Sequence, residues 1–363
     1  MLLRNLFFAL LLKASTVSAA YPTCQLDEEC VRLCDCSPLR GILKPRGMTV
    51  TEIHVFKDRQ CGLAPRGDAL LLRVYICCPK QSWILPNSQM CGQTPPAFHV
   101  VAGREAPLNG FPWIAMLLYR SSRDWSLVPK CAGSLITNRF VLTAAHCLDI
   151  DGFELRTVRL GEHNTSSNPD CANMLGRWRC TARHLEINVD KSISHKDYRV
   201  VGGKHYNDIA LLRLQYPVRY TPEIQPVCIK PVPEFRNFSF ENETMQIAGW
   251  GYSQWQSMSN VLLQAYVKGR SADECSGYAK DVLGFDRDSQ ICAGGQDGTD
   301  TCDGDSGGPL MATMGWGVDE FNYLAGITSY GARFGRTCGY GPAVYTKTSH
   351  FIEWIEWNMY TNQ

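Results

Sequence analysis

The distribution of cysteine constrains this chain more than any other feature of its sequence. Seven of its 17 cysteines fall in one short stretch that begins at Cys24 and ends with two adjacent cysteines. Such a stretch is too short to bury a stable core unaided, so cross-links must supply part of its stability. We therefore expect a disulfide-stapled domain over residues 21–78. A Pro- and Gln-rich connector over residues 79–99, which contains Cys91, follows it.

The N-terminus and the cysteine content both indicate an oxidising, extracellular compartment. Arg4 precedes an apolar run over residues 6–12, and small residues follow, which is typical of a secretory signal peptide over residues 1–20. About seven apolar residues cannot cross a hydrocarbon core of roughly 30 Å, so a membrane anchor is the less favoured alternative. No paired CxxC units occur at zinc-finger spacing, and disulfides are expected instead. We expect a secreted protein with no membrane partner.

The charge balance argues against a strongly basic or acidic surface. Lys and Arg total 36 against 35 Asp and Glu, a formal net charge of +1. No basic run is long enough to predict binding to nucleic acid, and we expect no such partner. Three sequons are candidate surface glycosylation sites in a secreted chain: Asn164, Asn237 and Asn242.

From residue 100 onward the pattern changes to that of an all-β domain. Short β-rich runs recur between turn signals, at residues 139–144, 209–214, 245–248, 324–329 and 343–346. This spacing is typical of antiparallel barrels or sandwiches. Only the last segment has helical periodicity, and its apolar residues share one face: Phe351, Trp354, Ile355 and Met359. We expect an all-β domain over residues 100–363 that ends in a helix.

Three short motifs contain the residue types of a nucleophilic catalyst. His146 ends a strand-like run, Asp208 leads into a buried run, and Ser306 lies in the motif Gly-Asp-Ser-Gly-Gly-Pro. A serine hydroxyl is a weak nucleophile until a neighbouring base takes its proton, and His146 is a candidate base. The imidazole in turn needs a partner that fixes its tautomer, and a carboxylate can supply it.

In this order the motifs resemble those of the trypsin/chymotrypsin family, and the resemblance covers residues 100–363. It implies two antiparallel Greek-key β-barrels, with the three residues in the cleft between them and a C-terminal helix. It also implies that His146 is the base for Ser306 and that Asp208 orients this base. The amides of Gly304 and Ser306 would form the oxyanion hole. A relative with this fold and a broken triad is the alternative, against which the intact His146, Asp208 and Ser306 argue.

The same resemblance predicts a primary pocket for a basic side chain. Asp300, six positions before the serine, would lie at its base, where a buried carboxylate favours Arg or Lys. Ser329 and Gly331 resemble the wall of that pocket. Ala343 stands where trypsin-like enzymes usually carry Gly, so we expect a narrowed pocket, an altered preference between Arg and Lys, and lower rates.

The resemblance further implies a zymogen. The family is activated by cleavage before a sequence of the Ile-Val-Gly-Gly type, which the run beginning at Val100 resembles, and the new α-amino group would pair with Asp305. The residue before this cut is His99, not Arg or Lys. We therefore expect that the protease does not activate itself and needs an upstream protease of different specificity. The alternative is that His99 reflects neutral variation at a site that tolerates substitution.

Spacing alone does not fix the connectivity of the cysteines, but the resemblance implies it for the protease part. The implied pairs are Cys91–Cys228, Cys131–Cys147, Cys171–Cys180, Cys275–Cys292 and Cys302–Cys338. The first would tether the N-terminal chain after cleavage. No cofactor is expected for catalysis, but Glu162 resembles a calcium ligand of trypsin-like enzymes, which makes a structural calcium ion a candidate there.

The N-terminal module resembles the clip domain of arthropod serine proteases. Its cysteine pattern fits three disulfides: Cys24–Cys77, Cys30–Cys61 and Cys36–Cys78. Cys34 is then left as a free thiol or as a link to another thiol or chain, and swapped roles for Cys34 and Cys36 stay open.

Clip proteases act in extracellular cascades of immunity, clotting and patterning. The resemblance therefore implies a protein substrate (a downstream zymogen or a cytokine precursor), an upstream activating protease and a serpin inhibitor. A non-catalytic adaptor that assembles cascade partners is the second function class.

Overall fold

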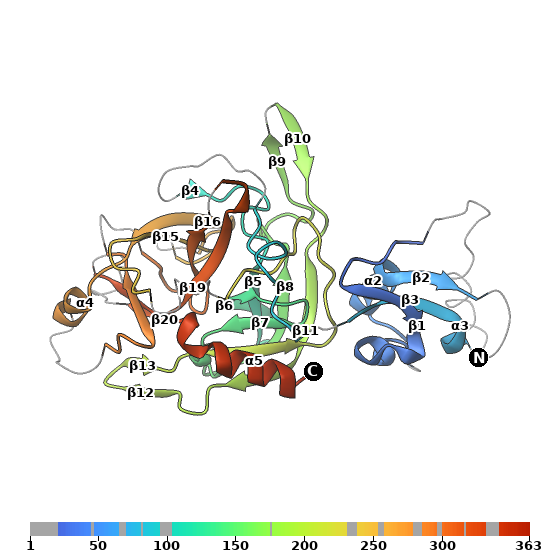
Figure 1. Ribbon diagram of the computed structural model, residues 1–363, viewed down its shortest axis with the longest axis horizontal. Coiled ribbons are helices and arrows are strands. Elements are labelled where there is room, and N and C mark those ends of the chain that lie inside the picture. The colour runs from blue at the N-terminus through green and yellow to red at the C-terminus, as the bar shows by residue number, and fades with distance from the viewer. Residues whose placement is uncertain are drawn as a thin grey trace. The chain divides into compact units, whose positions relative to one another are not determined.

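The chain forms two compact units, which divide between residues 81 and 82 (Figure 1). The structure is a computed structural model that describes residues 21–44, 47–64, 70–80, 83–94, 104–174, 176–230, 238–252, 258–278, 285–295, 300–315, 317–331 and 341–363. The expected signal peptide and four predicted site residues lie outside these ranges: His99, Val100, Asn237 and Cys338. None of the helices that the structure describes is long and apolar enough to span a membrane.

The first unit is a three-stranded antiparallel sheet with short helices. Its elements are β1 (Glu28–Arg32), two 3-10 helices (Leu33–Asp35 and Ser37–Ile42), α2 (Val50–Arg59), β2 (Gln60–Leu63), α3 (Leu70–Arg73) and β3 (Val74–Pro79), and the strand order is β1-β3-β2. Helix α2 begins with a capping box. Thr49 Oγ1 accepts a hydrogen bond from the Glu52 amide over 3.2 Å, and Glu52 Oε2 accepts one from the Thr49 amide over 2.8 Å.

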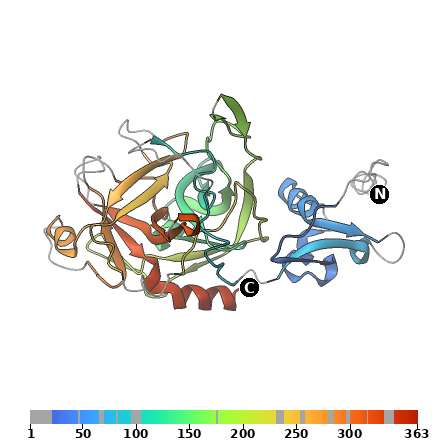
Figure 2. The same cartoon turned by 45° about the horizontal axis from the view of Figure 1, so that its top comes forward.

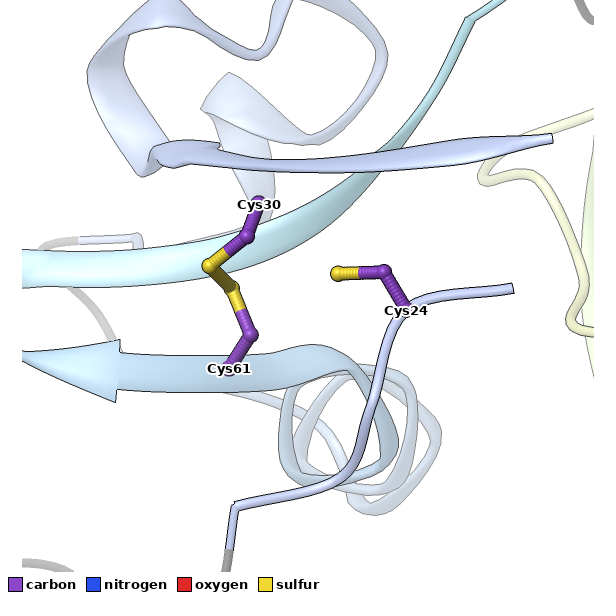
Figure 3. A group of neighbouring side chains, drawn as sticks. All are labelled: Cys24, Cys30 and Cys61. Carbon is purple, nitrogen blue, oxygen red and sulfur yellow. A yellow bond between two sulfur atoms is a disulfide. The ribbon is translucent and has the colours of Figure 1, made fainter. Parts of the chain in front are cut away.

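Three disulfides hold this small unit together: Cys24–Cys77, Cys30–Cys61 and Cys36–Cys78. These are the pairs that the resemblance implied. Figure 3 shows the sulfur of Cys24 pointing toward the Cys30–Cys61 disulfide. All of these sulfur atoms are used in disulfides, so they are not thiolate ligands for a metal ion. Among the described cysteines Cys34 is the free one, and it is half-buried.

The second unit begins with a closed six-stranded barrel of order β11-β14-β7-β6-β5-β8. Its strands are β5 (Ile114–Ser121), β6 (Leu127–Leu135), β7 (Phe140–Thr143), β8 (Phe153–Leu160), β11 (Leu185–Ser194) and β14 (Ala210–Leu214). Every residue of β7 is buried, as expected for a strand in the barrel wall. Two hairpins extend from the barrel, β9–β10 (Cys171–Met174 and Arg177–Cys180) and β12–β13 (Arg199–Val201 and Lys204–Tyr206). The first projects well beyond the barrel (Figure 1).

The remaining strands form a seven-stranded antiparallel sheet of order β17-β20-β19-β18-β15-β16-β4. They are β4 (Arg104–Glu105), β15 (Thr244–Gly249), β16 (Leu263–Lys268), β17 (Gln290–Ala293), β18 (Pro309–Met314), β19 (Phe321–Gly331) and β20 (Ala343–Lys347). Tyr323 and Tyr345 are fully buried in its core. The ladder of this sheet does not close among the described residues, whereas the first barrel does.

Few helices accompany the two sheets. They are α4 (Ala272–Tyr278), α5 (Ile352–Thr361) and 3-10 turns at Ala145–Leu148, Gly317–Asp319 and Thr348–Phe351. Helix α5 buries Ile355 and Met359, and it lies along one edge of the second unit (Figure 2). The predicted fold class is confirmed: an all-β protein with a C-terminal helix and a small disulfide-rich N-terminal unit.

Candidate active site

His146 and Asp208 are brought together by the pairing of two barrel strands. β7 and β14 are antiparallel, with Thr143 opposite Ala210, so the residues after β7 lie beside those before β14. The backbone amide of His146 donates to Asp208 Oδ1 over 2.9 Å, and His146 Nδ1 lies 2.8 Å from Asp208 Oδ2. The two carboxylate oxygens therefore fix both the position and the orientation of this histidine.

The Asp208 carboxylate is buried, and 1% of the residue's surface is exposed. Ser329 Oγ donates to Asp208 Oδ2 over 2.5 Å, and Thr346 Oγ1 donates to the Asp208 backbone carbonyl over 2.8 Å. Burial alone would raise the pKa of Asp208, but the hydrogen bonds from His146 and Ser329 hold this pKa below its ordinary value. An ionised Asp208 favours the tautomer in which His146 carries its proton on Nδ1, leaving Nε2 to accept one.

Ser306 lies in the turn that leads into β18, and this turn is fixed against the closed barrel. Its backbone carbonyl accepts a hydrogen bond from the amide of Ala132 in β6 over 2.8 Å. The next residue, Gly307, has a φ of +76°, and a Cβ there would lie 2.2 Å from Thr143 Oγ1, so only glycine fits. Because Thr143 ends the strand that leads to His146, this contact brings the Ser306 turn to the histidine.

Two contacts that the predicted triad and oxyanion hole would make are absent among the described residues. Among the described residues, no hydrogen bond joins His146 to the Ser306 side chain. The amides of Gly304 and Ser306, which we expect to form the oxyanion hole, donate to no acceptor in the same part of the chain. Catalytic hydrogen bonds of this kind often form only in the substrate complex.

Asp300 is a second buried carboxylate of the site. Its Oδ1 accepts a hydrogen bond from the Thr301 amide over 2.7 Å and one from Tyr345 Oη over 3.4 Å. Burial raises the pKa of Asp300 to about 7, because these hydrogen bonds do not replace the solvation that the carboxylate loses. A cation bound beside Asp300 would stabilise its ionised form.

The predicted pocket residues Gly331 and Ala343 lie opposite each other in the β19–β20 ladder. A Cβ built on Gly331 would lie 3.7 Å from Ala343 Cβ. Ala343 is 1% exposed, so its methyl group occupies interior space. Ser329, two residues before Gly331, directs its hydroxyl to Asp208. The neighbouring segments 296–299 and 332–340 lie outside the described residues.

Asp305, the residue before Ser306, has a buried carboxylate with two backbone donors. Its Oδ1 accepts from the Gly251 amide over 2.8 Å, and its Oδ2 accepts from the Cys302 amide over 3.0 Å. Burial raises the pKa of Asp305 to about 6. Within the described ranges no cationic side chain pairs with it. Val100, its expected partner, lies outside those ranges.

His205, which contacts His146, and two tyrosines that contact His205 were not predicted from the sequence. The ring of His205, at the end of the β12–β13 hairpin, meets His146 edge-on with ring centroids 5.1 Å apart. His205 Nδ1 lies 2.9 Å from Tyr198 Oη, and its ring stacks on Tyr330 at 5.9 Å. Burial, with a smaller effect of His146, lowers the pKa of His205. A histidine three residues before Asp208 was the sequence signal that could have found it.

The structure also brings together the cysteine pairs expected around the site. They are Cys91–Cys228, Cys131–Cys147, Cys171–Cys180 and Cys275–Cys292. Cys302 is disulfide-bonded as well, and its expected partner Cys338 lies outside the described residues. Cys131–Cys147 joins β6 to the turn that contains His146, and so it limits movement of the histidine.

Two of the three candidate glycosylation sites are described. Asn242 is exposed, and its backbone amide donates to the Gly269 carbonyl over 3.0 Å. Asn164 is half-buried, and its side-chain Oδ1 accepts from the Ser166 amide over 3.0 Å. Neither of these contacts uses the side-chain nitrogen to which a glycan is attached, so both asparagines stay candidates.

Glu162, the candidate calcium ligand, has one of its two carboxylate oxygens in an ion pair. Glu162 Oε2 lies 2.9 Å from Arg159 Nη1 and 3.1 Å from His184 Nδ1, so a guanidinium already neutralises this carboxylate. The nearby carboxylate of Asp170 accepts from the His163 amide through Oδ2 and from Ser167 Oγ through Oδ1. Calcium takes six to eight oxygen ligands. The second carboxylate oxygen, Glu162 Oε1, is buried and has no hydrogen-bond partner among the described residues, so calcium at Glu162 stays a prediction.

Comparison with known proteins agrees with this architecture. Residues 100–355 match the family described as Trypsin. The Spaetzle-processing enzyme of Drosophila melanogaster is 35% identical over 363 residues, covering 92% of this chain and 89% of that protein. CLIP domain-containing serine protease B15 of Anopheles gambiae is 32% identical and covers 92% and 88%. The solved structure of the Drosophila Grass clip serine protease of the Toll pathway has a TM-score of 0.66 at 28% identity, with 93% and 95% covered.

The fold and the site together define the class of protein. A closed barrel that positions His146 and Asp208, joined to a second sheet that positions Ser306, is the architecture of a two-lobed serine protease. The matches make this assignment more specific. The chain belongs to the trypsin family, and its disulfide-stapled N-terminal unit makes it a clip-domain serine protease.

Proposed function

We propose that this clip protease is a secreted endopeptidase that cleaves proteins after Arg or Lys in an extracellular proteolytic cascade. Ser306 is the nucleophile, His146 the general base, Asp208 the residue that orients the base, and the amides of Gly304 and Ser306 bind the oxyanion. The observation that carries the proposal is the His146–Asp208 pair, held by two hydrogen bonds beside the Ser306 turn.

The arrangement supports acyl transfer in two steps. Ser306 Oγ attacks the scissile carbonyl carbon while His146 Nε2 takes the hydroxyl proton, and the two amides stabilise the negative charge on the carbonyl oxygen. His146 then gives the proton to the leaving amine as the peptide bond breaks. Water attacks the acyl-enzyme by the same route and releases the second product. Asp208 stabilises the imidazolium that forms in each step.

Specificity for a basic side chain is supported by Asp300. Its carboxyl group, with a pKa of about 7, gains a counter-charge from a guanidinium or an ammonium group, whereas an apolar side chain would leave it without a cation. The Ala343 methyl group opposite Gly331 narrows the space beside it. The pocket is therefore expected to accept Arg and Lys at reduced rates and with an altered ratio between them.

Activation is proposed to occur between His99 and Val100. A free α-amino group at Val100 would supply the cation that the Asp305 carboxylate lacks among the described residues, and it would order the Ser306 turn through that pair. A protease selective for Arg and Lys cuts poorly after His99. The zymogen therefore depends on an upstream protease of different specificity and does not convert itself.

The names of the relatives support a role in a cascade. One is a Spaetzle-processing enzyme, and the matching solved structure is a clip protease of the Toll pathway. By analogy we propose a protein substrate cut at few sites (a zymogen or a cytokine precursor), and control by a serpin inhibitor. Secretion, consistent with the disulfide content, would place these partners outside the cell.

The test uses full-length protein in which the residues before Val100 are replaced by the recognition sequence of an unrelated protease. After cleavage, peptides with Arg, Lys, Leu or Phe before the scissile bond are assayed. We expect turnover of the Arg and Lys peptides, and a loss of roughly 10⁶-fold in kcat for Ser306→Ala. Ala343→Gly should raise the rates and change the ratio of Arg to Lys.

The outcomes separate the parts of the proposal. Turnover of Leu or Phe peptides only would overturn the assignment of Asp300, and unchanged rates for Ala343→Gly would overturn the role of Ala343. No turnover at all, despite a freed Val100 terminus, would favour a non-catalytic adaptor. Rapid conversion of the purified wild-type zymogen by itself would contradict the need for an upstream activator.

A further inference from the structure

The candidate active site contains one more potential ligand than catalysis uses. His205 Nδ1 lies 3.8 Å from Asp208 Oδ2, the same oxygen that lies 2.8 Å from His146 Nδ1. One ligand atom from each of these three residues falls within 4.8 Å of the others. Two histidines and one carboxylate around a common point form a set of ligands that proteins use for Zn²⁺.

The distances suit a transition-metal ion. With metal–nitrogen bonds of roughly 2.0–2.1 Å, neighbouring ligand atoms of a tetrahedral site lie roughly 3.3 Å apart. The distances from Asp208 Oδ2 to the two Nδ1 atoms, 2.8 and 3.8 Å, lie on either side of this value, so each of these two pairs needs a shift of about half an ångström. The ligand atoms of His146 and His205 lie within 4.8 Å of each other. The side chains of His146 and His205 are 19% and 22% exposed, which leaves access from solvent and a fourth position for water.

The other clusters of ligand-type residues in the described part of the chain do not offer such a site. Three further groups bring together cysteine with histidine, glutamate or other cysteines. In each of them the sulfur atoms belong to disulfides, namely Cys24–Cys77, Cys30–Cys61 and Cys131–Cys147. A disulfide sulfur is not a thiolate and is a poor metal ligand.

We propose that Zn²⁺, or a divalent transition-metal ion of similar preference, binds His146, His205 and Asp208 and reversibly inhibits the protease. The ion takes the place of the proton on His146 Nδ1, and that proton moves to Nε2, so the imidazole stays neutral. The hydroxyl of Tyr198, 2.9 Å from His205 Nδ1, gives way to the ion. With its proton on Nε2, a metal-bound His146 cannot take the hydroxyl proton of Ser306. The inhibition, but not the binding, rests on the proposed function.

Binding is measured directly, without catalysis. Full-length uncleaved protein with Ser306→Ala and Cys34→Ser, which removes the free thiol, is titrated with ZnCl₂ in a calorimeter. We expect one ion per chain. His205→Gln removes a ligand and should weaken the affinity about tenfold or more, because changes even in outer-shell partners cost that much. Tyr198→Phe removes the competing hydroxyl and should tighten binding about fivefold.

The matched control is His54→Gln in the N-terminal unit. His54 Nε2 lies 3.2 Å from Asp58 in an exposed pair, so this variant reports adventitious binding by a surface histidine and carboxylate. Its affinity should equal that of the parent. An equal affinity for His205→Gln and the parent would overturn the site, as would a loss of binding in His54→Gln or weaker binding in Tyr198→Phe.

Inhibition is then measured with the cleaved, active protein. Zn²⁺ should reduce hydrolysis of the Arg peptide with an inhibition constant close to the calorimetric Kd, EDTA should restore the rate, and His205→Gln should need about tenfold more metal. Binding without inhibition in an active enzyme would overturn the inhibitory role. If no preparation hydrolyses any peptide, the proposed function fails while the calorimetry still decides whether the metal site exists.

Discussion

Two aspartates close to Ser306 in the sequence, Asp300 and Asp305, are buried at a large electrostatic cost. Desolvation raises the pKa of Asp300 to about 7 and that of Asp305 to about 6, against 3.8 in the unfolded chain. The folded protein therefore binds their protons more tightly than the unfolded chain does. Their contribution to stability is complete below about pH 4 and is lost as the pH rises through about 6 to 7. In the proposed function, each carboxylate would gain a cation at a later stage: Asp300 that of a substrate side chain, and Asp305 that of the new N-terminus.

For the uncleaved protein we predict that Asp305→Asn removes part of this pH dependence. The difference between a pKa of 3.8 and one of about 6 corresponds to about 3 kcal/mol in the free energy of unfolding between pH 4 and pH 7. Urea denaturation across that range should show a flatter profile for Asp305→Asn than for the parent. Asp151→Asn, at an exposed aspartate, is the control and should follow the parent. Parallel profiles for Asp305→Asn and the parent would contradict the prediction.

At the scale of elements, the segment from residue 83 to residue 94 is hydrogen-bonded to the rest of the protease unit through its backbone. The Gly92 amide donates to the Pro226 carbonyl over 2.8 Å, and the Gly92 carbonyl accepts from the Asn322 amide over 2.8 Å. Gly92 has a φ of +65°, and a Cβ there would lie 2.2 Å from the Asn322 carbonyl oxygen. Both the conformation and the close approach therefore require glycine.

We predict that Gly92→Ala destabilises the protease unit by about 2 kcal/mol or more, because it adds a backbone clash to the strain of a positive φ. The matched control is Gly202→Ala, at a φ of +59° with no atom within 4 Å of the added Cβ, so it measures strain alone at about 1 kcal/mol. Thermal unfolding followed by near-UV circular dichroism compares the two. An equal loss in both variants would show that the contact with Asn322 does not matter.

Local sequence patterns predicted the strands well, but they did not predict which strands pair with each other. The runs 139–144 and 209–214 contain β7 and β14, because continuous apolar runs between turn signals indicate buried strands. Their neighbours in the barrel, and the open ladder of the second sheet, depend on non-local pairing that periodicity does not encode. The capping box of α2 is present in the sequence as Thr-x-x-Glu from Thr49, but this helix was not predicted.

The candidate site likewise contains residues that motifs predict and residues that only the folded chain brings together. Short motifs and a family resemblance identified His146, Asp208 and Ser306, whose residue types are dictated by the chemistry. His205 was missed because its role depends on how the β12–β13 hairpin folds over His146. Glu162 was expected to bind calcium because its motif resembles a calcium loop, and the sequence did not predict that Arg159, three residues earlier, pairs with one of its oxygens. That ion pair depends on how the loop after β8 folds, which the motif does not encode.

At the scale of the whole molecule, the proposed activation cut falls inside a covalent loop. Cys91 and Cys228 are 137 residues apart and form a disulfide, and the bond between His99 and Val100 lies between them. Cleavage there would convert an intrachain disulfide into an interchain one. The clip unit would therefore remain attached to the active protease and could act wherever the protease acts, because the linkage keeps its effective concentration high.

We predict that this disulfide alone holds the cleaved chains together under denaturing conditions. After cleavage before Val100, the wild-type protein should run as one species on a non-reducing denaturing gel and as two after reduction, since no other described disulfide joins the two sides of the cut. The double variant Cys91→Ser/Cys228→Ser should give two species without reductant. Cys171→Ser/Cys180→Ser, which opens a hairpin on one side of the cut, is the control and should behave like the wild type. A single species from the cleaved Cys91→Ser/Cys228→Ser protein would mean that another cysteine, such as Cys34, joins the chains.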